Sequence, residues 1–259
     1  MTPAIADVKS ALTTGLTELH LPTMKRSYEE AARLAERETL SYERYLLELV
    51  TRECEDRGHK RIQRLLRQSH IPSEKSLANF NLKRLPPKVA LLTKSLIEGG
   101  VLDRRDNVLA FGNPGSGKTH LLCAIGQELI ARGRRMYFKT SALLVQDLLV
   151  AKRDLKLSRF IKKLAHFEGV IIDDLGYAQQ GREEMEVLFT LLAERYERGS
   201  VFISSNLPFS KWDGLFKDPM TTAAAIDRLV HHCVLLELNI PSYRVEQAKK
   251  AKEETSSPA

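Results

Sequence analysis

The stretch NVLAFGNPGSGKTH, residues 107–120, decides the fold of this protein of 259 residues. An apolar run leads into the pattern G-x-x-x-x-G-K-T, and a helical stretch, HLLCAIGQELIARG, follows it directly. Glycines in such a loop let backbone N–H groups face a phosphate chain, and the helix presents its positive dipole end to the same anion. The pattern is that of a P-loop (Walker A), and it predicts a nucleotide-binding site.

The loop supplies most of the predicted nucleotide-binding residues. Lys118 is expected to neutralise the β and γ phosphates during catalysis, and the Thr119 hydroxyl to ligate Mg²⁺. We therefore expect ATP and Mg²⁺ as cofactors. The full set of predicted nucleotide-binding residues in the loop is Gly112, Asn113, Pro114, Gly115, Ser116, Gly117, Lys118, Thr119 and His120.

Four more short apolar runs follow the first, and helical stretches of a dozen or more residues separate them. Continuous apolar strands that alternate with helices predict a parallel sheet covered on both faces, here a doubly wound α/β domain of five strands. Ligands of such sheets bind beyond the carboxyl ends of the strands, so functional residues should follow each run. The five predicted strands are 107–112, 135–140, 169–174, 200–205 and 233–238.

Acidic and amide side chains do follow two of these strands. Asp173 closes the apolar run GVIID, where a P-loop protein needs a Walker B carboxylate for magnesium. Asp174 is the next residue and should project in a different direction, so it can face the γ-phosphate and polarise water. Asn206 follows VFISS, and its amide should reach the cleft beside the γ-phosphate. Two aspartates capping the next turn are the alternative explanation.

The order of these motifs resembles that of an AAA+ ATPase of the initiator and helicase-loader branch, which includes DnaA and DnaC. The resemblance makes Asn206 the sensor 1 residue and Arg228, on the last helix before the final strand, the arginine finger. The stretch PSYRVEQ resembles the sensor 2 segment and nominates Arg244 for nucleotide binding. Walker B reads Asp-Asp here, as in that branch, instead of the commoner Asp-Glu.

The whole chain further resembles the IstB family of insertion-sequence ATP-binding proteins, from about residue 16 to residue 245. This resemblance implies an ATPase that assembles on duplex DNA and recruits a transposase. It also implies a homo-oligomer with shared ATP sites. Relatives carry an extra DNA-contacting helix after the second strand, which here nominates Lys152, Arg153 and Lys156.

The Asp174 side chain is one methylene shorter than the commoner glutamate, so we expect a slow basal rate. No base-reading motif is visible, so we expect little sequence preference, and the cysteine usage predicts a cytoplasmic protein.

Residues 17–70 read as helices, because they contain almost no glycine and place leucines at helical spacing. HIPSEKSL (70–77) predicts a turn with Ser73 as the N-cap of a following helix. We therefore expect an all-α domain for partner or DNA binding at 1–80, the AAA+ domain at 81–245 and a flexible tail at 246–259. The short stretch after the last strand predicts no separate C-terminal lid domain.

One short segment carries more than the whole net positive charge of the chain. Residues 57–88 hold nine basic residues against Glu74 alone, whereas the net charge of the chain is +7. Such a block indicates either a polyanionic partner or a solvated helix face. As DNA-binding candidates it supplies Arg57, Lys60, Arg61, Arg64 and Arg67.

Composition and the remaining motifs narrow the classes of function. Three distant cysteines without a CxxC pattern argue for a reducing compartment and against a zinc site. No apolar run approaches the ~18 residues of a membrane span. Three alternatives stay open: a DnaC-like helicase loader, a P-loop kinase of a small metabolite, and a DNA-binding scaffold that does not hydrolyse ATP. A kinase would need an arginine-rich lid and an acceptor pocket, which the sequence does not display.

Overall fold

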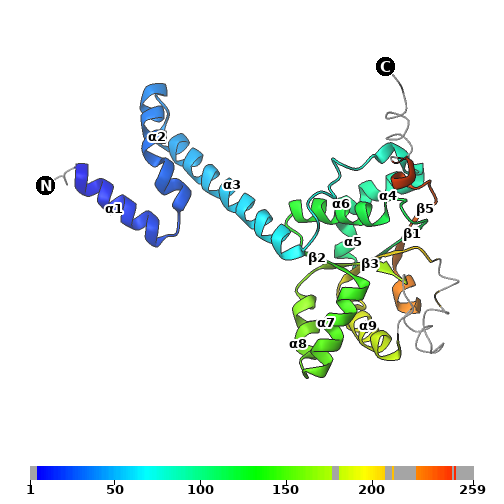
Figure 1. Cartoon of the computed structure of the whole chain (residues 1–259). Coiled ribbons are helices and arrows are strands. Elements are labelled where there is room, and N and C mark those ends of the chain that lie inside the picture. The colour runs from blue at the N-terminus through cyan, green and yellow to red at the C-terminus, as the bar shows by residue number, and fades with distance from the viewer. Residues whose placement is uncertain (1–4, 177–180, 208–211, 213–225, 247, 249–259) are drawn as a thin grey trace, which may run out of the picture. The chain divides into compact units, whose positions relative to one another are not determined.

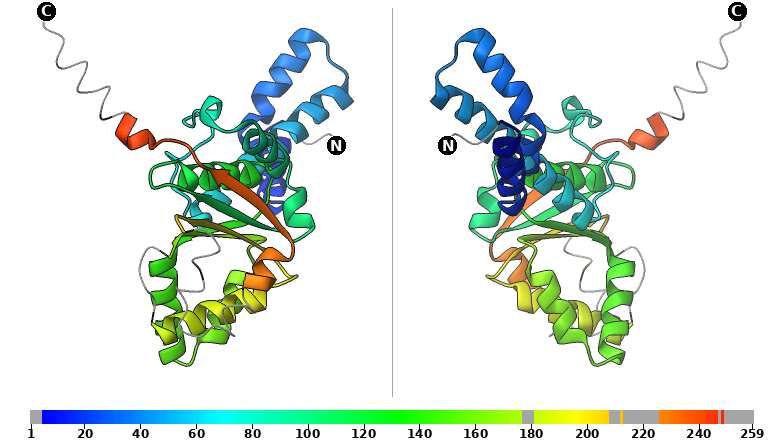
Figure 2. Two further views of the ribbon diagram at one scale, coloured as in Figure 1. Left: turned by 90° about the vertical axis from the view of Figure 1, so that its right-hand side faces the viewer. Right: turned by 90° about the vertical axis from the view of Figure 1, so that its left-hand side faces the viewer.

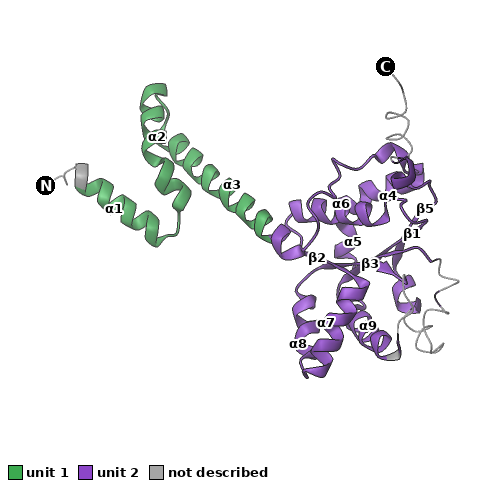
Figure 3. Ribbon diagram, in the orientation of Figure 1, with its two compact units in different colours: residues 1–64 green, residues 65–259 purple. Residues whose placement is uncertain are grey.

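The computed structural model describes residues 5–176, 181–207, 212, 226–246 and 248. The chain divides into two compact units, residues 1–64 and 65–259 (Figure 3). The division falls inside the long helix α3 (Tyr42–Ser69) and not at residue 80, because residues 65–80 pack with the second unit. Most of the predicted tail 246–259 lies outside the described residues. No helix in the described ranges combines the length and the apolar character that crossing a lipid bilayer requires.

Unit 1 is built from α1 (Ile5–Glu18), α2 (Pro22–Glu38) and most of α3, so the predicted helical character of the N-terminal region is confirmed, and α1 extends it before residue 17. A buried carboxylate ties α2 to α3. Glu53 of α3, 3% exposed, accepts hydrogen bonds from the N–H groups of Thr23 and Met24 in the first turn of α2. Burial opposes its charge, but the hydrogen bonds from Arg57 and from these amides hold the pKa of Glu53 below its ordinary value. Glu53 thus caps a helix of which it is not part.

Unit 2 contains the predicted sheet. Its five strands are all parallel and lie in the order β2-β3-β4-β1-β5, so both the strand number and the parallel sheet are confirmed. Side chains at the centre of the sheet, such as Leu109, Ile171 and Phe202, are fully buried. The strands are β1 (Asn107–Gly112), β2 (Met136–Thr140), β3 (Gly169–Leu175), β4 (Ser200–Ser205) and β5 (Cys233–Leu238).

Helices cover both faces of this sheet (Figures 1 and 2). On one face lie α4 (Pro87–Ile97) and α6 (Lys118–Ala131), preceded by the short helix η1 (Leu82–Arg84). On the other lie α7 (Ser141–Arg153), α8 (Leu157–Ala165) and α9 (Arg182–Arg195). A single turn, α5 (Gly100–Asp103), joins α4 to β1. This is the doubly wound arrangement that the alternation of strands and helices predicts.

The segment 70–81 between α3 and η1 has turns but no helix, so the prediction that Ser73 caps a helix is wrong. Tertiary contacts hold the segment instead of intrahelical hydrogen bonds. Ile71 is 9% exposed, and a methyl group added to Gly126 of α6 would lie 2.8 Å from its side chain. The backbone carbonyl of Pro72 accepts a hydrogen bond from Gln127 Nε2 at 2.8 Å. The segment therefore lies along α6, the helix that begins at the P-loop.

A buried arginine fixes α8 to the sheet. Arg195 is 4% exposed, and its guanidinium donates to four backbone carbonyl groups. Burial lowers the pKa of Arg195 to about 10. Because these carbonyls belong to the end of α8 and the starts of β3 and β4, one side chain joins three elements. The acceptors are the carbonyl oxygens of Leu164, Phe167, Glu168 and Ser200.

Candidate functional site

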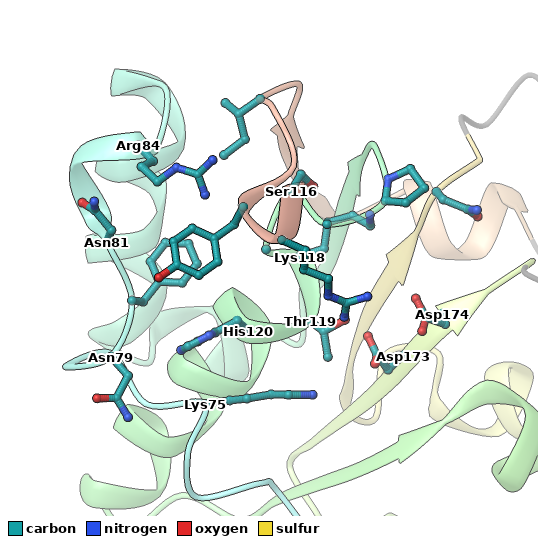
Figure 4. A pocket seen from close by; sticks show the side chains of 18 residues that line it. Lys75, Asn79, Asn81, Arg84, Ser116, Lys118, Thr119, His120, Asp173 and Asp174 are labelled. Atoms are coloured by element: carbon teal, nitrogen blue, oxygen red, sulfur yellow. The ribbon is translucent and has the colours of Figure 1, made fainter. Parts of the chain in front are cut away.

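A cavity of about 370 Å³ lies at the carboxyl ends of β1, β3 and β4 (Figure 4). Its walls come from four stretches of unit 2: the P-loop with the start of α6, the ends of β3 and β4, the segment 75–84, and the segment 240–244. The volume is in the range of small-molecule sites in proteins. The lining residues that the sequence predicts are Pro114, Gly115, Ser116, Gly117, Lys118, Thr119, His120, Asp173, Asp174, Asn206 and Arg244.

The P-loop turns sharply into α6. Gly117 has φ 96°, a backbone conformation that favours glycine, and a methyl group added there would crowd the ring of Phe80 at 3.1 Å. The Lys118 ammonium donates to the carbonyl oxygens of Gly112 (2.8 Å) and Asn113 (2.9 Å). Gly112 and Asn113 therefore hold the Lys118 side chain in place. Neither residue lines the cavity. Burial is the main cause that lowers the pKa of Lys118, and the nearby aspartates oppose it.

One buried hydroxyl in the loop fits a phosphate ligand. Ser116 is 1% exposed and lines the cavity, and its Oγ has no hydrogen-bond partner among the described residues. Buried polar groups in proteins are normally paired, so an unpaired hydroxyl in an anion-binding loop is consistent with a phosphate oxygen. Thr119 and Asp173 offer the oxygen ligands that Mg²⁺ prefers, in a site that leaves room for substrate phosphates.

Asp173 and Asp174 both face the cavity because β3 contains a bulge. In a regular strand, neighbouring side chains point to opposite faces of the sheet. Here the register against β4 shifts between Ile172 and Leu175, and Asp174 has a left-handed backbone with φ 56°. Ser204 of β4 holds the bulge: its Oγ accepts from the N–H of Asp174 at 2.9 Å and donates to the Asp173 carboxylate. The bulge thus turns the second carboxylate into the cavity that the first already faces (Figure 4).

The two carboxylates differ in their surroundings. Asp173 is 4% exposed and hydrogen-bonded to Ser204, whereas Asp174 is more exposed. Partial burial, followed by repulsion from Asp173, raises the pKa of Asp174, and Lys118, Lys75 and Arg244 oppose this rise. A carboxylate with a raised pKa is suited to accept a proton from water, and a fixed, buried one is suited to bind a metal ion.

The C-terminal segment closes the cavity over the P-loop. The N–H of Tyr243 donates to the Gly115 carbonyl oxygen at 2.9 Å, and Arg244 lines the cavity beside it. Arg84 joins this segment to η1: it donates to Pro241 O at 3.0 Å and lies over the Tyr243 ring at 5.0 Å. Arg244, nominated only by resemblance, is therefore in the same cavity as the P-loop.

Sequence reasoning missed one wall of the cavity. Its residues come from the segment 75–84, which reads as a turn or linker, and from the stretch before Arg244. The sequence did hold one indication of this wall, because Phe80 is a lone aromatic residue in a turn segment. His120 holds this segment against α6, because its Nε2–H donates to the Ser76 carbonyl oxygen at 2.9 Å. The missed lining residues are Lys75, Asn79, Phe80, Asn81, Arg84, Ile240 and Tyr243.

Arg228 lies away from this cavity. It belongs to the helical residues 226–230 and lines a second cavity of about 320 Å³ with Asn107, Glu197 and His232. Asn107 begins β1 and His232 directly precedes β5, so this cavity lies at the amino ends of the strands. A strand of six residues is roughly 17–20 Å long, farther than an arginine side chain reaches. Among the described residues, Arg228 is thus separated from the nucleotide cavity of its own subunit.

Some of the predicted DNA-binding residues form ion pairs with carboxylates of the chain itself. All five on α3 are exposed, but Arg57 pairs with Glu53, and Lys60 pairs with Asp56. Arg61, Arg64 and Arg67 are exposed farther along α3. On the other unit, Lys152 pairs with Glu186, Arg153 lies 3.5 Å from Asp154, and Lys156 is exposed between α7 and α8.

Helix α8 adds cations that the sequence analysis did not select, namely Arg159, Lys162 and Lys163. Like Lys156, which directly precedes the helix, they are exposed, and none of the four has a carboxylate within 4 Å in the described part of the chain. They line a shallow surface cavity together with His166. The apolar side chains of α8 supply the signal that could have found them, because Ile161 and Leu164 pack inward and leave the basic residues on the outer face.

A five-stranded parallel sheet with a P-loop after β1 and paired aspartates at the end of β3 defines this protein as an α/β P-loop domain of the AAA+ class, preceded by a helical region. The structure of AMPPCP-bound DnaA from Aquifex aeolicus has the same fold. Its TM-score is 0.57 at 19% identity, over 71% of this chain and 56% of the DnaA chain.

The chain belongs to the family of IstB-like ATP binding proteins, and the sequence model of this family matches residues 14–251. It is 41% identical over 245 residues to the insertion sequence ATP-binding protein y4iQ/y4nD/y4sD of Sinorhizobium fredii (strain NBRC 101917 / NGR234), covering 94% of this chain and 82% of that protein. It is 33% identical to the insertion sequence IS5376 ATP-binding protein of Geobacillus stearothermophilus, covering 91% and 94% of the two chains. The resemblance seen in the sequence is confirmed.

Proposed function

We propose that this protein is an ATP-dependent DNA-binding ATPase that assembles on duplex target DNA and recruits or stimulates a transposase. One observation carries the proposal: the P-loop, both aspartates, Asn206 and Arg244 line a single cavity in a chain of the IstB-like family. The relatives named as insertion sequence ATP-binding proteins support the link to transposition. A kinase has no comparable support.

Within one subunit, we assign roles by burial and position. Lys118 and the P-loop amides bind the phosphates, and the Ser116 hydroxyl donates to one of their oxygens. Thr119 and Asp173 would hold Mg²⁺, which supplies charge neutralisation between the β and γ phosphates when bound. Asp174 orients and deprotonates the attacking water, and Asn206 positions it.

Hydrolysis further requires a second subunit. Arg228 is held at the amino ends of the strands, where the described structure gives it no access to its own nucleotide cavity. A cation aimed at the γ-phosphate stabilises the transition state. Supplied by a neighbouring copy, Arg228 would make ATP turnover conditional on assembly. This is the arrangement with shared ATP sites that the resemblance implies.

For DNA, the charges favour α8 over the first part of α3. The α8 cations lack ion-pair partners in the described structure, whereas Arg57 and Lys60 of α3 are paired with carboxylates on their own helix. A paired cation must give up its carboxylate before it neutralises a phosphate. Phosphate contacts provide affinity without sequence information, which fits a protein that accepts many targets.

Salt titration of duplex DNA binding tests this assignment and the proposed function. Each neutralised phosphate contributes about 0.9 to the slope of log affinity against log salt. Lys162→Ala with Lys163→Ala should flatten that slope by about 2 and weaken unrelated DNA sequences alike. The matched pair Arg57→Ala with Lys60→Ala should change it less. Absence of ATP-dependent DNA binding by the unaltered protein would contradict the proposed function itself.

The partner separates a transposition helper from a helicase loader. Purified protein with ATP and DNA should stimulate strand transfer by the transposase of the same element and leave the loading of a replicative helicase unchanged. The opposite result would favour the loader. Comparing turnover with ATP affinity distinguishes an ATPase from a scaffold in which ATP binding alone controls assembly.

A further inference from the structure

A cation outside the P-loop pattern enters the nucleotide cavity from the segment 70–81. Lys75 lines the same cavity as Lys118, Thr119 and the two aspartates. Figure 4 shows its side chain extending below Thr119 in the direction of Asp173. The side chain is partly buried, so its charged end lies in the cavity wall and not on the open surface.

The Lys75 ammonium has no ion-pair partner among the described residues. It lies over the ring of Phe138, 5.8 Å from the ring centroid. It nevertheless lies close enough to Asp174 to oppose the rise in the pKa of that carboxylate. A partly buried cation that is near two carboxylates but paired with neither is placed for a third anion in the same cavity.

The backbone on both sides of Lys75 is fixed to α6. Three residues before it, Pro72 O accepts from Gln127 Nε2, and one residue after it, Ser76 O accepts from His120. The donors lie on the helix that begins at Lys118, so the base of the Lys75 side chain is held relative to the P-loop. Such anchoring reduces the conformational entropy that a lysine loses on binding a ligand.

We propose that Lys75 binds the γ-phosphate of ATP within its own subunit, as a second lysine beside Lys118. This assignment rests on the proposed function, since it requires ATP in this cavity. Lys118 comes from the P-loop and Lys75 from the opposite wall, so the terminal phosphate lies between two cations. ADP lacks the group that Lys75 contacts, and the segment 70–81 then loses its contact with the nucleotide.

The test compares the affinities of ADP and of the non-hydrolysable ATP analogue AMPPCP. Lys75→Met keeps the apolar stem and removes the charge. It should weaken AMPPCP binding about 10- to 100-fold, the size of a hydrogen bond between charged groups, and leave ADP binding unchanged. Lys75→Arg should recover most of the loss. Lys83→Met on η1, which is exposed and outside the cavity, is the matched control and should affect neither nucleotide.

Hydrogen exchange gives a second, independent measurement. AMPPCP should protect the amides of residues 72–80 more than ADP does in the unaltered protein, and this difference should disappear in Lys75→Met. A purely structural role through Phe138 would instead lower the melting temperature and weaken both nucleotides equally. An unchanged ratio of the two affinities would overturn the proposal while leaving the proposed function intact. Failure of the unaltered protein to bind either nucleotide would overturn both.

Discussion

The two ends of the β-strands in unit 2 hold different parts of the predicted machinery. At the carboxyl ends, the P-loop, the paired aspartates and Asn206 converge on one cavity. At the amino ends, Arg228 lies in a separate cavity beside Asn107 and His232. The carboxyl edge of the sheet is suited to bind a nucleotide. In the described structure, Arg228 at the amino edge does not reach the nucleotide cavity of its own subunit. Under the proposed function, a complete hydrolytic site would combine the carboxyl edge of one copy with the amino edge of another.

Removal of the key cation at each edge should produce the largest and most different effects. Lys118→Ala should abolish nucleotide binding, measured with a fluorescent ATP analogue, because the phosphates lose their buried counter-charge. Arg228→Ala should keep binding but lose turnover by about 10³- to 10⁵-fold, as expected for an arginine finger.

A mixture of these two inactive proteins on DNA tests whether the edges belong to different copies. At some interfaces the intact P-loop of Arg228→Ala meets the intact Arg228 of Lys118→Ala, so partial ATPase activity should return. Light scattering controls for assembly. If assembled mixtures stay inactive at every ratio, Arg228 does not act across the interface, and Arg244 becomes the residue to examine next.

The paired aspartates should separate binding from turnover within the carboxyl edge. Asp174→Asn should bind ATP and DNA normally and lose about 10²- to 10⁴-fold in turnover, the range of general base catalysis. Burial and Asp173 raise the pKa of Asp174 above 3.8, and only its charged form accepts a proton. Activity should therefore fall with decreasing pH at a higher pH than for an ordinary aspartate. Loss of ATP binding in Asp174→Asn would show that the two aspartates have the opposite roles.

A smaller effect is expected when alanine replaces the buried polar residue that holds the functional residues at each end of the strands. Ser204 holds the aspartate bulge. Asn107 donates to Leu229 O at 3.1 Å and accepts from Val201 N–H, which fixes the residue directly after Arg228. Alanine at either position leaves buried groups unpaired and should cost about 1–3 kcal/mol of stability. Both variants should retain ATP binding and lose part of their turnover.

Mixing again sharpens the comparison for these two variants. Lys118→Ala subunits should partly restore turnover to Asn107→Ala, whose own nucleotide cavity is intact. They should not restore Ser204→Ala, whose defect lies in that cavity. Thr190→Ala, a hydroxyl removed from an exposed position on α9, serves as the control for surface effects. Equal rescue of both variants would mean that the two edges are not independent.

The residues that sequence reasoning located share one property: each is next to a strong local pattern. Lys118 and Thr119 belong to a loop whose glycines can be read directly, and Asp173 ends an apolar run. Parallel strands then bring these residues to one edge, so their convergence was predictable without coordinates. Lys75 had no such marker, because it lies in a segment held by tertiary contacts, mainly with α6.

By itself, the sequence determined the AAA+ class, the five parallel strands and the residues at their carboxyl ends, because hydrophobic periodicity and glycine spacing are local properties of the chain. The tertiary structure alone decided that a bulge held by Ser204 turns Asp174 into the cavity of Asp173. It also decided that Lys75 enters that cavity, and that Arg57 and Lys60 are paired while the cations of α8 are not. These outcomes depend on which distant side chains meet, and charge pairing and backbone strain are set by such contacts and not by neighbours in sequence.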